Sequence, residues 1–181
     1  MSKPKDSIIP KQVKIAFIGD SGVGKSSLVN YSIEDEYVTN NEQTNLIDIV
    51  FKRIELNESN ILIFAMWDFS GRADSIKIRT ELYPELQAIA YCFDLSNKTS
   101  FQNLEVWIKE VKKAGGERLI PICLGLKCDK AKVVDLNAIQ QFTQKYKMSY
   151  LEISVKDIST VKKFYYEFGG VLYDMVKSNK K

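Results

Sequence analysis

The stretch Gly19-Asp20-Ser21-Gly22-Val23-Gly24-Lys25-Ser26 fits the pattern G-x-x-x-x-G-K-[ST], which is typical of a phosphate-binding loop. The glycines of such a loop let the backbone come close to a polyphosphate, so that several N–H groups point at its oxygens. Lys25 would reach the terminal phosphates, and the Ser26 hydroxyl would bind Mg²⁺. The same letters also occur by chance in a glycine-rich turn between a strand and a helix, so the neighbouring sequence decides.

That neighbouring sequence favours the nucleotide site. Residues 13–18 form an apolar, strand-like run, and Leu28 and Val29 begin a helical pattern. A strand, the loop and then a helix are the surroundings that this motif requires, and the positive end of the helix favours an anion. We therefore predict that the loop residues contact the nucleotide: Asp20, Ser21, Gly22, Val23, Gly24, Lys25, Ser26 and Ser27.

Composition limits the class of protein. A chain of 181 residues is about one domain. The formal net charge of +3 is too small to indicate nucleic acid as a partner. The absence of histidine from the sequence excludes imidazole metal sites and histidine-activated nucleophiles. The three cysteines lack metal-ligand spacing and suit a reducing cytoplasm, with Cys92 and Cys123 expected in the core.

No segment of the sequence resembles a membrane span or a signal peptide. The longest apolar run, residues 61–67, is far too short to cross a bilayer, and residues 177–181 contain no cysteine that could carry a lipid. We expect a soluble, cytoplasmic monomer without a lipid anchor, which reaches membranes only through partners. Residues 1–11 are predicted to be a flexible tail, residues 12–177 the folded domain and residues 178–181 a short basic tail.

The order of apolar runs predicts an α/β fold. Strands are expected at 13–18, 46–56, 61–67, 89–93, 119–126 and 150–153, of which the second and third form an antiparallel hairpin. Helices are expected from Leu28, from an N-cap at Ser100 to the glycines 115–116, around 136–142 and along the apolar stripe 161–175. Residues 34–44 and 68–80 look irregular. The result is a mostly parallel six-stranded sheet with one antiparallel hairpin strand and helices on both faces, the P-loop NTPase fold.

Ligands of such folds bind at the carboxyl ends of the strands, where two further candidates for the phosphate end lie. Asp68 could hold Mg²⁺, and the N–H of Gly71 could contact a terminal phosphate. D-x-x-G is by itself more often a simple turn, but here it follows a strand and a phosphate loop. Thr44 could complete the Mg²⁺ shell and hold the last phosphate, although its spacing alone fits an ordinary polar loop residue equally well.

The later strand ends supply candidates for the base. The Asp129 carboxylate could accept hydrogen bonds from N1–H and the amino group of guanine, a paired donor edge that adenine lacks. The Lys127 stem would lie over the purine ring. The alternative is an exposed charged turn. In Ser154-Val155-Lys156 a backbone N–H could meet guanine O6, a signal with no value in isolation.

Taken together and in order, these motifs resemble those of Ras-superfamily small GTPases, and most of all the Rab branch, over residues 13–176. Trp67-Asp68-Phe69-Ser70-Gly71 is similar to W-D-T-A-G, Leu126-Lys127-Cys128-Asp129 to N-K-x-D, and Glu152-Ile153-Ser154-Val155-Lys156 to E-x-S-A-K. Thr44 falls at the switch I threonine and Tyr37 at the aromatic that packs on guanine. The resemblance implies GTP/GDP and Mg²⁺ as cofactors, with the metal on Ser26, Thr44 and Asp68.

Three departures from the family pattern carry information. Arg72 stands where the family has the glutamine that orients the attacking water; a guanidinium only donates, so we expect slow intrinsic hydrolysis. Arg72 could instead stabilise transition-state charge as an arginine finger, or simply point at solvent. Leu126 replaces the asparagine that ties the base loop to the phosphate loop, which should weaken guanine binding. Val155 replaces a small alanine and could crowd the base.

Three functions remain open at this point. The first is a GTP-dependent switch, in which Lys25, Thr44, Gly71 and Arg72 act on the terminal phosphate. Such a switch would bind effectors through Ile49, Trp67 and Leu82, and a GAP and a GEF are possible partners. The second is a GTP-binding scaffold that hardly hydrolyses its nucleotide, which the residues at 72 and 126 favour. The third, a P-loop ATPase or nucleotide kinase, is disfavoured by Asp129.

Overall fold

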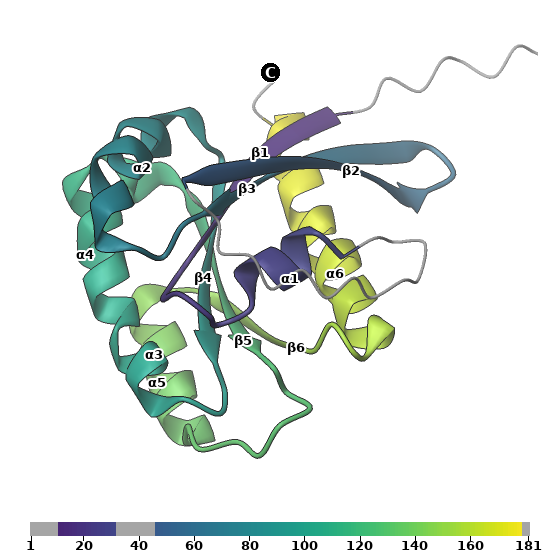
Figure 1. The fold of residues 1–181 in the computed structure, drawn as a ribbon. Helices are drawn as coiled ribbons and strands as arrows, with labels where there is room; N and C mark the ends of the chain where they lie inside the picture. The colour runs from purple at the N-terminus through teal and green to yellow at the C-terminus, as the bar shows by residue number, and fades with distance from the viewer. Residues whose placement is uncertain (1–10, 32–45, 179–181) are drawn as a thin grey trace, which may run out of the picture.

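The computed structural model describes residues 11–31 and 46–178. Within these residues, six strands form one sheet in the order β2-β3-β1-β4-β5-β6 (Figure 1). β2 (Ile47–Asn57) runs antiparallel to β3 (Asn60–Phe69), and the remaining neighbours are parallel. The parallel strands are β1 (Lys11–Ile18), β4 (Ala88–Asp94), β5 (Ile120–Leu126) and β6 (Ser149–Ile153). The predicted mixed sheet with one hairpin is therefore confirmed.

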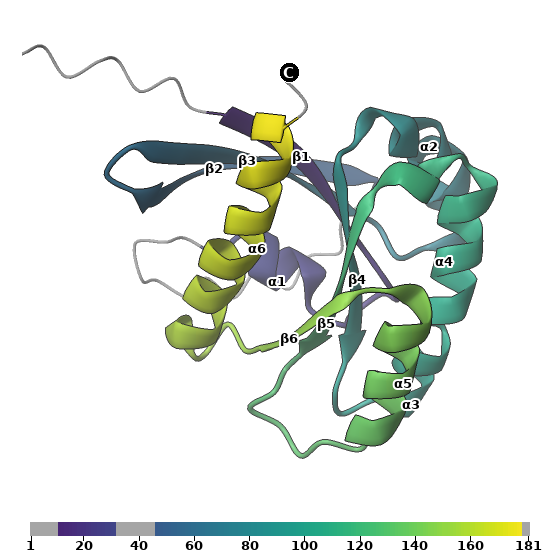
Figure 2. The same ribbon diagram turned by 180° about the vertical axis from the view of Figure 1, so that it is seen from behind.

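Helices cover both faces of the sheet, as the views from the front and from behind show (Figures 1 and 2). On one face, α1 (Lys25–Val29) and α6 (Ile158–Ser178) enclose a core that contains Phe17, Phe64 and Phe164. On the other face, a second core lies under four helices: α2 (Ile76–Leu82), α3 (Lys98–Gln102), α4 (Leu104–Lys113) and α5 (Leu136–Tyr146). Every residue of β4 is buried, which explains its continuous apolar run.

The stretch 68–80 differs from the predicted irregular segment. β3 continues to Phe69, a 3₁₀ turn covers Ala73–Ser75, and α2 follows. The segment is short and polar, so its own sequence gives little helical signal. Its anchor is a tertiary contact: Arg79 is buried against Glu110 of α4. A contact between residues so far apart in the chain leaves no local pattern.

The predicted cap at Ser100 is also wrong. Asn97 caps α3, because its side chain accepts hydrogen bonds from the amides of Thr99 and Ser100 at 3.0 and 3.3 Å. The Ser100 hydroxyl instead accepts from the Asp94 amide at 3.0 Å. The predicted glycine end is confirmed, since Gly115, with a φ of +79°, follows the C-cap residue Ala114 of α4.

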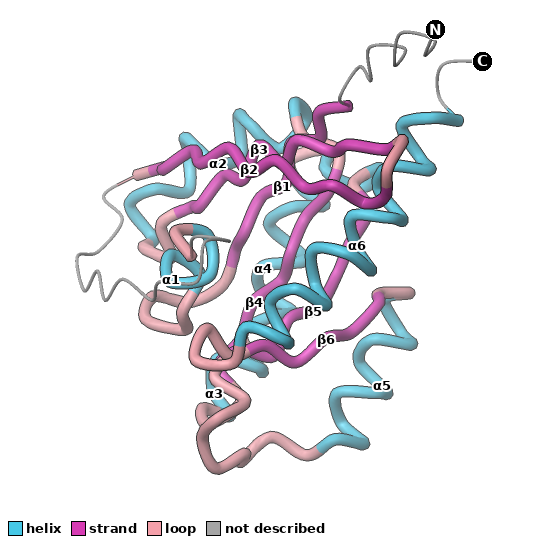
Figure 3. Tube along the Cα trace, turned by 90° about the vertical axis from the view of Figure 1, so that its right-hand side faces the viewer, coloured by secondary structure: helices cyan, strands magenta, loops and turns pink. Residues whose placement is uncertain are grey.

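The first and last described elements lie near the two ends of the chain. β1 begins at Lys11, the last residue assigned to the N-terminal tail, and α6 ends at Ser178. In the described part of the chain, no helix is both long and apolar enough for a membrane span. The connections after β1, β5 and β6 lie along one edge of the sheet (Figure 3), where the candidate site is found.

Candidate nucleotide-binding site

The phosphate loop leads from β1 into α1 and is held tightly against the sheet. Gly19 has a φ of +142°, and a Cβ at this position would lie 2.1 Å from the carbonyl oxygen of Cys92 in β4. Only glycine fits this close approach of two backbones. The loop is therefore fixed at the end of the central strands, as a phosphate-binding loop has to be.

Lys25 lies at the start of α1 with its side chain folded along this loop. Its Nζ donates to the carbonyl oxygens of Gly19 at 2.9 Å and Asp20 at 3.0 Å, and the residue is 5% exposed. Burial lowers the pKa of Lys25, and the charge of Asp68 opposes that effect. The Asp68 carboxylate at the end of β3 is thus close enough to act on this ammonium, so the loop and the D-x-x-G motif share one site.

Gly71 lies in direct contact with the phosphate loop. A Cβ on Gly71 would be 2.4 Å from the backbone nitrogen of Ser21, so any larger residue would push the two segments apart. Asp68 is completely buried, and Ser26 is the second residue of α1. A carboxylate and a hydroxyl at the loop are the hard oxygen ligands that Mg²⁺ prefers, and these residues fit that ion. Thr44 and Tyr37 lie outside the described residues.

The base loop after β5 is connected to the phosphate loop by Lys127. Its Nζ donates to the Gly22 carbonyl oxygen at 2.6 Å and forms an ion pair with Asp94 at 2.7 Å. Leu126 is 3% exposed, and its side chain packs beside Gly24. The two loops therefore stay tied although Leu126 cannot form the hydrogen bonds of an asparagine.

Asp129, the predicted base reader, is held from two sides. One carboxylate oxygen accepts from the Ser154 hydroxyl at 2.7 Å, and the other faces the Lys156 ammonium at 3.1 Å. The hydrogen bond from Ser154 is the main cause that lowers the pKa of Asp129. The carboxylate is therefore charged and oriented. Val155 between them is half-buried against the first core.

The Arg72 side chain is paired with the nearby Asp74. Its Nε and Nη2 donate to the Asp74 carboxylate at 3.1 and 2.7 Å, and both side chains are about half exposed. The hydrogen bond from Arg72 lowers the pKa of Asp74. Of the three roles considered for Arg72, this half-exposed ion pair is nearest to a side chain that points at solvent.

Two polar side chains that the sequence did not single out as functional fix the phosphate loop from α4. Asp20 accepts from Asn103 Nδ2 at 2.7 Å and from the indole N–H of Trp107 at 2.9 Å. Asn103 directly precedes α4 and Trp107 lies one turn later. Polar groups at a spacing of four residues on an otherwise buried helix face are the signal that could have revealed this contact.

The three residues of the expected effector surface lie on one side of the sheet. Ile49 of β2 is 44% exposed and pairs across the strands with Trp67 of β3. Trp67 and Leu82 are half-buried and pack against the second core. Phe51, two residues after Ile49 and 63% exposed, extends the same face and was not predicted. The sequence signal for it was the alternation along β2.

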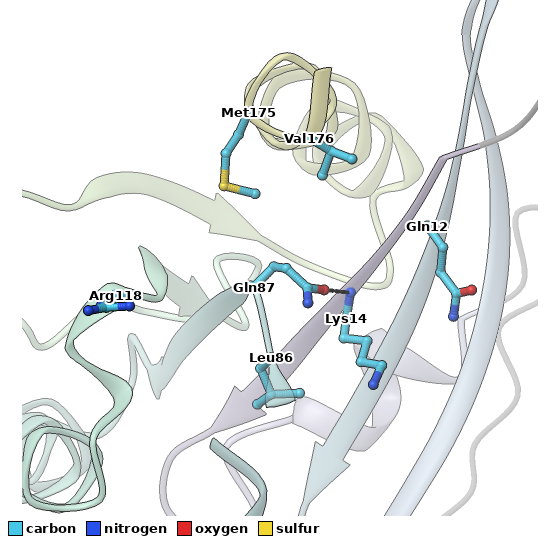
Figure 4. A pocket seen from close by; sticks show the side chains of 7 residues that line it. All are labelled: Gln12, Lys14, Leu86, Gln87, Arg118, Met175 and Val176. Carbon is cyan, nitrogen blue, oxygen red and sulfur yellow. Dashed lines mark hydrogen bonds between the residues drawn. The ribbon is translucent and has the colours of Figure 1, made fainter. Parts of the chain in front are cut away.

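A separate hollow of about 490 Å³ lies near the start of β1, between the turn before β4 and the end of α6 (Figure 4). Gln87 borders it and accepts a hydrogen bond from the Lys14 amide at 2.8 Å. None of the predicted nucleotide residues lines this hollow. It is therefore distinct from the site at the carboxyl ends of the strands.

The chain is similar to known proteins along most of its length. The sequence model of the Ras family matches residues 14–173. The chain is 31% identical over 150 residues to the Ras-related protein Rab-1A of Dictyostelium discoideum, covering 82% of this chain and 74% of that protein. It is 28% identical to the Ras-related protein RIC1 of Oryza sativa subsp. japonica, covering 91% and 82%. It is also 28% identical to the GTP-binding protein YPT1 of Saccharomyces cerevisiae, covering 82% and 72%.

The fold, the phosphate loop and these matches define a small GTPase, and the chain belongs to the Ras family. Within that family it is Rab-like, as its motifs suggested. Ras-family GTPases bind GTP and GDP with Mg²⁺, and they work with effectors, exchange factors and activating proteins. The roles of the individual site residues remain predictions.

Proposed function

We propose that this protein is a guanine-nucleotide switch of the Rab-like type, which binds GTP with Mg²⁺, hydrolyses it slowly and recruits effectors in intracellular transport. The observation that carries the proposal is the hydrogen-bonded Asp129. Its carboxylate is ionised and held by Ser154 and Lys156 at the same sheet edge as the phosphate loop. Such a group accepts from the donor edge of guanine, whereas adenine offers no matching pair.

The other residues have complementary roles in this proposal. Lys25 and the loop amides would hold the phosphates, and the N–H of Gly71 would contact the last of them. Mg²⁺ would bind to Ser26, Asp68 and Thr44, where it supplies positive charge to the phosphate oxygens. Tyr37 would pack on guanine, with the Lys127 stem across the ring.

Slow hydrolysis follows from the residue at position 72. The guanidinium of Arg72 lacks an acceptor for the attacking water and is occupied by Asp74. This same pair supports the second candidate, a GTP-binding scaffold without useful turnover. An activating partner that supplies a catalytic group would return the protein to the first candidate.

Two measurements separate the candidates. The nucleotide released from denatured, purified protein is identified by chromatography, and a guanine nucleotide supports both candidates whereas an adenine nucleotide rejects both. Single-turnover hydrolysis is then followed with purified protein and Mg²⁺. Phosphate release over hours favours the slow switch, and no release within a day favours the scaffold.

A further inference from the structure

Arg79 of α2 holds the backbone on both sides of Gly71. The residue is 2% exposed, and its Nη1 donates to the carbonyl oxygens of Arg72 at 2.7 Å and Ser70 at 3.2 Å. Gly71 lies between these two carbonyl groups. A single guanidinium nitrogen therefore restrains the peptide unit that carries the Gly71 N–H and the peptide unit that follows Arg72.

The rest of the Arg79 guanidinium is bound to α4. Its Nε and Nη2 donate to the two carboxylate oxygens of Glu110 at 2.7 and 2.8 Å, an arrangement that fixes direction as well as distance. The Tyr83 hydroxyl donates to the same carboxylate at 2.7 Å. The guanidinium also lies over the Trp107 ring, 4.6 Å from its centroid. Arg79 is thus joined to α4 by two hydrogen bonds and a ring contact.

The same helix also holds the phosphate loop. Trp107, which stacks on Arg79, donates its indole N–H to Asp20 at 2.9 Å, and Asn103 donates to the same carboxylate at 2.7 Å. Asn103, Trp107 and Glu110 follow one another at intervals of four and three residues, so they share one face of the helix. α4 therefore binds the phosphate loop with one end of this face and the Gly71 segment with the other.

We propose that these four residues, Arg79, Asn103, Trp107 and Glu110, form a clasp that positions Gly71 for the terminal phosphate and thereby sets the preference for GTP over GDP. The inference rests on the proposed nucleotide switch. Gly71 already touches the loop, since its Cβ would lie 2.4 Å from the Ser21 nitrogen. An amide that is in place before binding does not have to be ordered on binding. GDP lacks the terminal phosphate, so its binding gains nothing from an amide that is already in place.

The test compares Glu110→Gln with a matched control. Glu105→Gln, also on α4, removes a charge that likewise accepts from a cation and a tyrosine hydroxyl, here Lys145 at 2.8 Å and Tyr146 at 3.1 Å. Dissociation constants are measured for GDP and for a non-hydrolysable GTP analogue. We expect Glu110→Gln to raise the dissociation constant of the analogue about tenfold and that of GDP less than about twofold. Glu105→Gln should change neither dissociation constant.

A second variant protects the test against misfolding. The double substitution Arg79→Met with Glu110→Leu removes the clasp without leaving a buried charge unpaired, which proteins often tolerate. This double variant should also bind the GTP analogue more weakly while binding GDP nearly as tightly as the wild type. Equal weakening of both nucleotides, or no weakening, in both the single and the double variant would overturn the inference, because it would show a structural role alone.

Amide hydrogen exchange at residues 70–72 in the nucleotide-free protein gives a readout that does not depend on binding. Both clasp variants should exchange faster there than the wild type and the Glu105→Gln control. Unchanged exchange contradicts the clasp. Failure of the wild type to bind either nucleotide rejects the proposed function instead, so the two failures can be told apart.

Discussion

Lys127 Nζ and the carbonyl oxygen of Gly22 are 2.6 Å apart, and this hydrogen bond joins the base loop to the phosphate loop. The same ammonium forms an ion pair with Asp94, which is 10% exposed at the end of β4. Lys127 has a φ of +60°, a conformation that is uncommon for residues other than glycine. The backbone therefore turns at Lys127, and this turn directs the Lys127 side chain toward Gly22. Since Leu126 offers the phosphate loop only apolar contact, Lys127 supplies the hydrogen bond between the two loops.

Substitution of this bridge should accelerate nucleotide release. In Lys127→Met the aliphatic stem remains and the charged hydrogen bond is lost, which is worth about 1.5–3 kcal/mol for a charged group and less where solvent reaches it. We expect the dissociation rate of GDP to rise roughly tenfold. Stopped-flow release of a fluorescent GDP analogue measures it. The exposed Lys130→Met is the control, and a similar rise in that variant would reject the bridge.

Arg72→Gln should increase the rate of GTP hydrolysis. The amide restores an acceptor for the attacking water, and the pair with Asp74 is lost. We expect at least a tenfold increase in the single-turnover rate, in keeping with the contribution of a positioned group.

Two further variants separate the roles considered for Arg72. Asp74→Ala frees the guanidinium: if Arg72 acts as an arginine finger, this variant hydrolyses GTP faster than the wild type and Arg72→Ala more slowly. If Arg72 is inert, neither variant changes the rate. An increase in Arg72→Ala comparable with that in Arg72→Gln would show that removing the arginine, and not the added amide, is what matters.

Leu126→Asn should strengthen GDP binding and weaken the fold. The amide can form the hydrogen bonds to the base and the phosphate loop that the family motif implies, which corresponds to about tenfold in affinity. Leu126 is buried in the first core, so the loss of apolar burial should lower the free energy of unfolding by about 1–2 kcal/mol. Calorimetric titration and urea unfolding of nucleotide-free protein measure the two effects. Unchanged GDP affinity would show that Lys127 already supplies what the asparagine adds.

Because the ammonium of Lys52 is buried, we expect the stability of the fold to depend on pH. The residue is 7% exposed, and its Nζ lies over the rings of Tyr31 and Tyr165, 5.8 and 5.2 Å from their centroids. Within the described residues, its ammonium has no hydrogen-bond acceptor. Burial lowers the pKa of Lys52 from 10.5 to about 8. Between these values the unfolded chain binds more protons than the folded one, so stability from this group rises with pH from about 8 to about 10.5.

The comparison of wild type with Lys52→Met isolates this effect from other groups that titrate. At pH 7 the variant should be more stable by roughly 1–2 kcal/mol, allowing for partial screening. The difference should shrink as the pH rises toward 10. Urea unfolding at several pH values measures it, with the exposed Arg53→Met on the same strand as control. A difference that stays constant with pH would reject the buried charge as its cause.

The elements that carry a strong local pattern were predictable from the sequence. The α6 stripe Val161, Phe164, Phe168 and Leu172 is buried as expected. Val171, which the apolar pattern of this stretch also includes, is 52% exposed because the helical period places it off that face. Strand ends could be placed because β4 and β5 are continuous apolar runs that stop at polar residues. The phosphate loop was predicted from its own motif, and Asp129 from its place after β5.

The features that escaped prediction depend on contacts between distant parts of the chain. The burial of Arg79 requires Glu110, 31 residues later, and the position of Asp20 requires Trp107, 87 residues later. An arginine in a polar segment has the same local sequence whether it is buried or exposed. The direction of Lys127 toward Gly22 likewise depends on how two loops meet at the sheet edge.

The central claim is that the carboxylate of Asp129 selects guanine for the phosphate loop that contains Lys25. Equilibrium titration of nucleotide-free protein with GDP and with ADP in the presence of Mg²⁺ tests it most directly, using the wild type and Asp129→Asn. We expect the wild type to bind GDP at least a hundredfold more tightly than ADP, because adenine would leave the acceptor oxygens of Asp129 without a partner. Asp129→Asn should lose most of that preference. Equal binding of the two nucleotides by the wild type would contradict the account.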